Sequence, residues 1–270
     1  MFQKTLKTKL DAIYKKYHSA RFLNSDPLIC VHRFDEPLQI EIVGLLASCL
    51  AYGRVERIIF SIDSILKRVQ NDLFSFVLNT TFYEKKELLY GFKHRFNTGT
   101  DIAILLETVK CILSEYGSIG NLIGKFVSDN RTYIMKDVLI KFTHKIRTYK
   151  DSIEKSYFKS FSYLIPSPEK GSACKRMNMY FRWMIRKNDG IDFGIWKNIP
   201  PSMLIIPVDI HVAKIARYLH LSNRKNADWK MAEEISKSLQ QIEPKDPIKY
   251  DFSLCRYGME KFRYEQKSRE

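Results

Sequence analysis

The stretch GSACKRMNMYFRWMIRK, from Gly171 to Lys187, decides our interpretation of this chain. Apolar side chains recur along it at the spacing of one helix face, which predicts a helix over 172–187. Ser172 is a good N-cap type, and Lys175 then falls in the first helical turn. A lysine is unexpected there, because the positive end of the helix dipole and the usual capping pattern both favour an acidic residue. This unfavourable charge suggests that Lys175 has a function of its own.

The same helical spacing recurs along most of the chain, whereas the alternation typical of strands is scarce. We therefore predict an all-α fold. A long segment without regular periodicity, 188–208, connects two of the helices and is more typical of a functional or packed connection than of a flexible one. The segments that can each bury an apolar stripe are 38–52, 55–70, 101–115, 119–127, 132–148, 172–187, 210–220 and 228–241.

The chain of 270 residues is basic, with a formal charge of +15 and a sequence pI of about 9.5. This balance favours a polyanionic partner such as nucleic acid, although a generally soluble basic surface is the simpler alternative. The aromatic content of 13 % also fits stacking on unpaired bases, although most of these side chains belong in a core.

The cysteines and the apolar segments indicate the compartment. The five cysteines lie far apart without zinc-type spacing, so we expect reduced thiols. The N-terminal segment lacks the continuous apolar region of an export signal. The longest uncharged apolar segment, 42–53, is too short to cross a bilayer but suits a buried helix. We therefore expect a cytoplasmic protein with no membrane partner.

A second helix start lies in the segment IIPVDIHVAKIARYLHL, where Asp209 precedes an apolar helix face. By itself Asp209 is a routine N-cap, and Lys175 by itself is a solvated lysine on a polar helix face. Together they suggest chemistry, because a lysine at a helix N-terminus among arginines has its protonated form disfavoured and its amine made nucleophilic. A nearby carboxylate can then stabilise a positive transition state.

The run PSPEKGSACKR followed by VDIHVAKIARYL resembles the signature of the helix-hairpin-helix DNA glycosylases. Lys175 and Asp209 are 34 residues apart, a spacing similar to that of the archaeal 8-oxoguanine glycosylases, and the whole chain resembles a bacterial family allied to them. The resemblance implies that Lys175 forms a Schiff base with the deoxyribose and that Asp209 assists base loss. It also implies a two-lobed fold with DNA across the cleft, one lobe being 38–187 with Lys175 and the other 1–37 plus 188–270 with Asp209.

The resemblance also implies where DNA is bound. The segment LLASCLAYGRVERI resembles the early helix and loop of those glycosylases, whose polar residues reach into the gap left by a flipped base. For each basic residue near Lys175, a solvated helix face is an equally good interpretation, and a structural role suits His211 as well. The predicted DNA-binding residues are Tyr52, Gly53, Arg54, Lys170, Gly171, Ser172, Arg176, Arg182 and His211.

We therefore expect a bifunctional DNA glycosylase/β-lyase of base excision repair, acting on a damaged base in double-stranded DNA, with 8-oxoguanine the leading candidate. We expect a monomer without cofactors, since excision through a lysine needs no metal and no four-cysteine cluster for an iron–sulfur centre follows the helices. One rival is a non-catalytic DNA-binding module that uses the same basic surface. The other is a metal-dependent nuclease built on His32, Asp35 and Glu36, a motif that also fits a helix-start cap.

Overall fold

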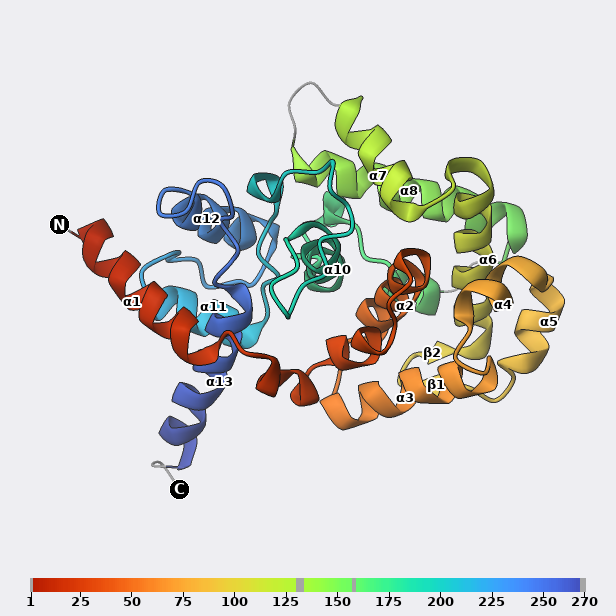
Figure 1. The fold of residues 1–270 in the computed structure, drawn as a ribbon, viewed down its shortest axis with the longest axis horizontal. Helices are drawn as coiled ribbons and strands as arrows, with labels where there is room; N and C mark the ends of the chain where they lie inside the picture. The colour runs from red at the N-terminus through yellow and green to blue at the C-terminus, as the bar shows by residue number, and fades with distance from the viewer. Residues whose placement is uncertain (1, 130–133, 157–158, 268–270) are drawn as a thin grey trace. The chain divides into compact units, whose positions relative to one another are not determined.

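The computed structural model describes residues 2–129, 134–156 and 159–267, and these are mostly helical (Figure 1). The predicted all-α class is therefore confirmed. Strand structure in the described residues is limited to a short antiparallel hairpin of β1 (Lys93–His94) and β2 (Asn97–Thr98). Within the same ranges, no helix combines the length and the apolar character needed to cross a membrane.

The chain divides into two compact units, unit 1 (Met1–Phe22 and Pro168–Glu270) and unit 2 (Leu23–Ser167). The 3-10 helix η1 (Ala20–Ser25) spans the first boundary. Unit 1 contains α1 (Phe2–Tyr17), η3 (Pro168–Lys170), α10 (Lys175–Ile185), η4 (Pro201–Met203), α11 (Ile210–Tyr218), α12 (Trp229–Gln240) and α13 (Asp251–Lys267). Unit 2 contains η2 (Pro27–Arg33), α2 (Pro37–Leu50), α3 (Val55–Arg68), α4 (Leu73–Asn79), α5 (Phe82–Leu88), the hairpin, α6 (Gly99–Tyr116), α7 (Ile119–Ser128), α8 (Met135–Ile153) and α9 (Lys159–Leu164).

Unit 2 is built around α2, which is buried from Gln39 to Leu50 because its sequence is almost entirely apolar. Helices η2, α3 and α4 pack on it, and α6 packs on α5, α7 and α8. The one acidic residue inside α2, Glu41, is buried and accepts hydrogen bonds from the Ile119 and Gly120 amides at 2.8 and 3.1 Å. It thereby satisfies the N-terminus of α7, which is where a buried carboxylate is stabilised.

Unit 1 is built around α10, in which every residue after Lys175 is buried. Arg182 lies inside the unit and donates to Asp192 at 3.1 Å and to Asp251 at the start of α13. Arg186 follows one turn later, 1 % exposed, and pairs with Asp189, Asp192 and Asp246. These arginines are buried because several carboxylates from later segments neutralise them.

The unit boundaries differ from the expected lobes. The second boundary falls after Ser167 instead of after Lys187, so Lys175 and Asp209 belong to the same unit. The ion pairs of α10 with carboxylates that follow it in the chain account for this. At the N-terminal side, residues 23–37 belong with α2 instead of with the C-terminal helices, because η2 packs on α2 and α3.

The observed helix bounds differ in places from those that the local sequence pattern predicts. The predicted helix 172–187 begins only at Lys175, and the N-cap position is Cys174 instead of Ser172. The start of the predicted helix 132–148, at 132–133, lies outside the described residues, and its continuation forms α8. Short helices α4, α5 and α9 were not predicted, because six or seven residues are too few to display a helical period.

Candidate active site

Lys175 is the first residue of α10, immediately after a residue with unusual backbone geometry. Cys174 adopts a left-handed conformation with φ of 46°, which is rare for a residue other than glycine. Its side chain is buried and makes no capping bond to the helix, while the Ser172 hydroxyl accepts a hydrogen bond from the Cys174 amide at 3.2 Å. The sharp turn places the Lys175 amine at the positive end of the helix.

Asp209 is the N-cap of α11, as predicted. Its Oδ1 accepts hydrogen bonds from the His211 and Val212 amides at 2.9 and 2.8 Å. This leaves Oδ2 for a second partner. The carboxylate is therefore held in one orientation by the backbone of its own helix.

The structure brings Lys175 and Asp209 together, with Nζ 2.9 Å from Oδ2. The aspartate side chain is 15 % exposed and the lysine side chain 37 % exposed, so the pair is accessible mainly through the amine. Burial favours the neutral form of Asp209, but Lys175 and the Val212 amide outweigh it and hold its pKa below the usual value. Asp209 is thus an ionised carboxylate fixed beside a primary amine.

A thiol and an imidazole lie in the same unit near this pair. Burial raises the pKa of Cys255 on α13 to about 12, and the charge of Asp209 adds to the effect. Cys255 is therefore a thiol and not a thiolate nucleophile at neutral pH. The Nδ1 atom of His211 is buried without a hydrogen-bond partner among the described residues, while its amide orients Asp209. His211 thus orients Asp209 through its backbone amide.

The predicted hairpin residues Lys170, Gly171 and Ser172 are exposed at the surface before α10. Gly171 has φ of +81°, a conformation that favours glycine, and its carbonyl accepts a hydrogen bond from the Trp229 amide at 3.0 Å. The turn is therefore anchored to the start of α12, and Lys170 and Ser172 on either side of Gly171 are exposed.

Two predicted DNA contacts need correction. Arg182 is 4 % exposed and committed to Asp192 and Asp251, so it neutralises buried carboxylates and does not face a phosphate. Arg176 is buried as well. The sequence suggested a charged side of the helix, but the carboxylates that pair with Arg182 lie later in the chain. The structure places both in the interior of unit 1.

The remaining predicted residues, Tyr52, Gly53 and Arg54, lie in unit 2 between α2 and α3. The Tyr52 hydroxyl donates to the His94 carbonyl or the Asn97 side chain, at 3.0 and 2.5 Å, so this loop is tied to the β1–β2 hairpin. All three residues line a cavity of about 440 Å³. Sequence reasoning missed Arg57, Phe60 and Arg68, which follow one face of α3, and Phe92 and Arg95, which come from the hairpin segment.

The metal-dependent alternative has no support in the side-chain arrangement. His32, Asp35 and Glu36 do not come together as a metal site, and the described part of the chain contains no group of three histidine, cysteine, aspartate or glutamate residues placed to hold a metal ion. Glu36 directly precedes α2 and occupies its N-cap position, but its side chain makes no capping hydrogen bond to the helix.

Comparisons with known proteins give one family. A search of curated proteins and a search of solved structures found no match. The model of a family described as "Protein of unknown function (DUF2400)" matches residues 26–260, which include Lys175, Asp209 and the loop at Tyr52. Since this match covers most of the 270 residues, the chain belongs to the DUF2400 family.

Proposed function

We propose that this protein is a DNA glycosylase with β-lyase activity, in which Lys175 is the nucleophile and Asp209 the assisting carboxylate. One observation carries the proposal, the 2.9 Å contact between Nζ and Oδ2 of residues 34 positions apart, each at the start of its helix. An amine beside a fixed, ionised carboxylate is what base displacement through a lysine requires. The basic chain is consistent with a polyanionic substrate.

The low pKa of Asp209 indicates its part in the reaction. A carboxylate that stays ionised is a weak base, so Asp209 stabilises positive charge on the sugar instead of storing a proton. Attack requires the neutral form of Lys175, and water can reach its side chain, which is 37 % exposed, to take up the proton. The neutral amine then bonds to C1′ while the bond from C1′ to the base breaks, and the base leaves with the bonding electrons and takes up a proton.

Strand cleavage follows from the same covalent intermediate. After the sugar ring opens, Lys175 is joined to C1′ as a protonated imine, which makes the C2′ hydrogen acidic. Loss of that proton expels the 3′ phosphate by β-elimination, and water then hydrolyses the imine and frees the lysine. Each step uses side chains and water alone, with Asp209 beside the positive charge throughout.

We also propose that the chain has a two-lobed helix-hairpin-helix fold and that it acts on one particular damaged base. In chain order, α9 and α10 are joined by the segment 165–174, which contains η3 and the left-handed Gly171, and this order of elements supports the first. We propose double-stranded DNA with 8-oxoguanine as substrate, from the lysine-to-aspartate spacing. Cleavage of a panel of duplexes with 8-oxoguanine, uracil, thymine glycol or an abasic site tests this, and preference for an oxidised pyrimidine contradicts the choice of base.

Borohydride trapping tests the central claim, because hydride reduces the imine to a stable amine and links protein to DNA. We expect Lys175→Gln to abolish trapping and cleavage while largely retaining binding to damaged DNA. Lys230→Gln is the matched control, since this exposed lysine lies on α12 of the same unit and is not among the predicted DNA contacts. Full trapping by Lys175→Gln moves the nucleophile elsewhere. Salt-sensitive binding without trapping by the unaltered protein favours the non-catalytic DNA-binding module.

A further inference from the structure

A cavity of about 440 Å³ in unit 2 lies between α3 and the segment that begins the β1–β2 hairpin. Its size is in the range of pockets that hold a small ligand or one nucleotide. The cations that line it are Arg54, Arg57, Arg68, Lys93 and Arg95, and no carboxylate is among the described residues of its lining. Such a concentration of one charge is costly without a partner, which indicates an anionic ligand.

Most of these cations are uncompensated. Arg54, Arg57, Lys93 and Arg95 are exposed, and none of them forms an ion pair with a carboxylate in the part of the chain that the structure describes. Arg68 differs, since it donates to the backbone carbonyls of Leu88 and Tyr90. Four arginine or lysine groups are therefore presented to solvent around one cavity.

The cavity walls are held together by a buried histidine. His94 is 4 % exposed, and its ring lies 2.8 Å from the Ser61 hydroxyl of α3 and 3.2 Å from the Tyr52 carbonyl. Because a carbonyl can only accept, Nε2 carries the proton in that second contact. The ring thus joins the hairpin to α3 and to the preceding loop, so the cations project from a fixed frame.

Gly53 supports the same frame at the edge of the cavity. Its φ of +104° is unfavourable for residues with a side chain, and a Cβ there lies 3.2 Å from Nη1 of Arg95. The arginine therefore passes close over the Gly53 backbone, and any larger residue displaces it. The observed position of the Arg95 side chain therefore requires a glycine at position 53.

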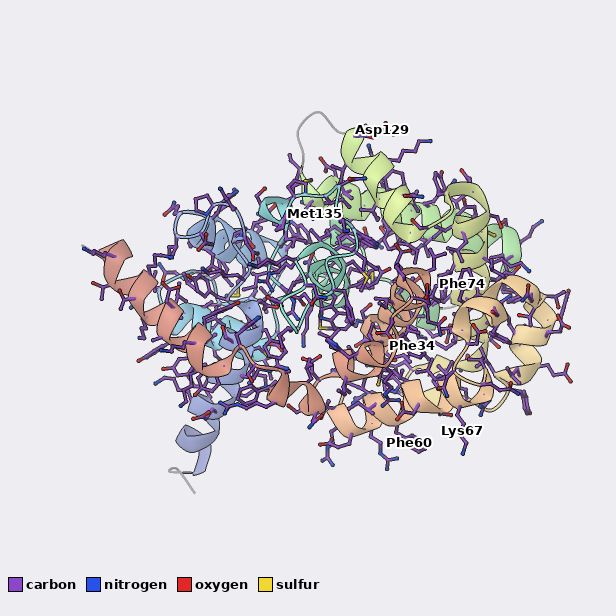
Figure 2. All side chains as sticks on the ribbon, in the orientation of Figure 1. Phe34, Phe60, Lys67, Phe74, Asp129 and Met135 are labelled. Atoms are coloured by element: carbon purple, nitrogen blue, oxygen red, sulfur yellow. The ribbon has the colours of Figure 1, made fainter. Side chains whose placement is uncertain are left out.

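Exposed aromatic side chains accompany the cations. Phe60 lines the cavity from α3 and is 65 % exposed, an unusual state for a phenylalanine, and Figure 2 shows it at the outer face of that helix. Phe96, beside Arg95 at the hairpin turn, is 62 % exposed and packs edge-on against Tyr163. An aromatic face beside arginines suits a nucleobase whose own faces are uncovered.

We infer that this cavity binds single-stranded nucleic acid, with the phosphates on Arg54, Arg57, Lys93 and Arg95 and an unpaired base stacked on Phe60. Both faces of a base within a duplex are already stacked on neighbouring bases, so none is open to Phe60. An unpaired base has an open face, and the ligand is therefore a single strand. All the lining residues belong to unit 2, whereas Lys175 belongs to unit 1, and binding at the cavity does not require the proposed chemistry.

Fluorescence anisotropy with a labelled oligothymidine of about 12 nucleotides tests this on the intact protein. Each phosphate contact contributes a slope of about −0.7 to the logarithm of the binding constant against that of salt. Arg57→Ala is therefore expected to make the slope shallower by about 0.7. Phe60→Ala is expected to weaken binding about 5-fold or more while leaving the slope unchanged, because stacking releases no counterions.

Two control variants match these changes outside the cavity. Lys125→Ala removes an exposed cation from α7, which Figure 1 shows well away from α3 in the same unit. Tyr83→Ala removes an exposed aromatic ring from α5. Both are expected to bind the oligonucleotide like the unaltered protein. Circular dichroism checks folding, which these exposed positions should leave unchanged.

Three outcomes overturn the inference. The first is an equal loss of slope in Lys125→Ala and Arg57→Ala, which means a diffuse basic surface. The second is unchanged affinity in Phe60→Ala. The third is a duplex of the same length that binds more tightly than the single strand. Borohydride trapping by the Arg57→Ala protein on an abasic duplex reports on Lys175 separately, so the two proposals can fail independently.

Discussion

Replacing Asp209 separates its capping role from its charge. Asparagine caps a helix about as well as aspartate, so Asp209→Asn retains the hydrogen bonds to the α11 amides and loses the ion pair with Lys175. Because the lysine is 37 % exposed, that loss lowers the free energy of unfolding by less than about 1 kcal/mol. Asp209→Ala also loses the cap, which costs about 1 kcal/mol more.

The rate of base excision depends on the negative charge of Asp209 and not on its capping bonds. Both lack the negative charge beside the developing cation, so we expect base excision to fall about 100-fold or more in each. Urea unfolding measures the stability and single-turnover excision measures the rate. Equal loss of rate with unequal loss of stability supports an electrostatic role. The reasoning is refuted if Asp209→Asn excises at the normal rate, or if the rate merely follows the stability.

The pH dependence gives a second measurement on the same residue. Burial favours the neutral form of Asp209, but Lys175 and the Val212 amide outweigh it, so the pKa is lower in the folded than in the unfolded protein. The charge therefore contributes stability above the unfolded pKa, and this contribution is lost as the pH falls through the folded value. The stability difference between the unaltered protein and Asp209→Asn should shrink on acidification. A difference that grows contradicts the assignment.

Two further predictions concern α10. Arg182→Met leaves Asp251 buried without its cation and leaves Asp192 with Arg186 alone, and we expect it to lower the free energy of unfolding by about 3–5 kcal/mol in urea titrations; a change below 1 kcal/mol contradicts the buried ion pairs. Cys174→Gly removes the cost of a left-handed side-chain residue and should be within about 1 kcal/mol of the unaltered protein, whereas Cys174→Val should be clearly less stable. Equal stabilities indicate that the left-handed turn is absent.

The sequence by itself determined the features that depend on local spacing. Apolar periodicity predicted the main helices, since a residue every three or four positions marks one face whatever that face packs against. Asp209 as an N-cap followed from its residue type and its place before an apolar stripe, and the structure confirms it. The placement of Lys175 in a first helical turn was also correct.

Only the tertiary structure decided what depends on residues distant in the chain. The sequence suggested that Arg182 faces solvent, but Asp251, 69 residues away, draws it into the interior. The 2.9 Å contact of Lys175 with Asp209 likewise exists only because the starts of two helices, 34 residues apart in the chain, meet within one unit. The basic cavity combines one face of α3 with a hairpin too short to have a period. Local propensity reports a residue's own backbone, whereas its charge partners and exposure are set by packing across the chain.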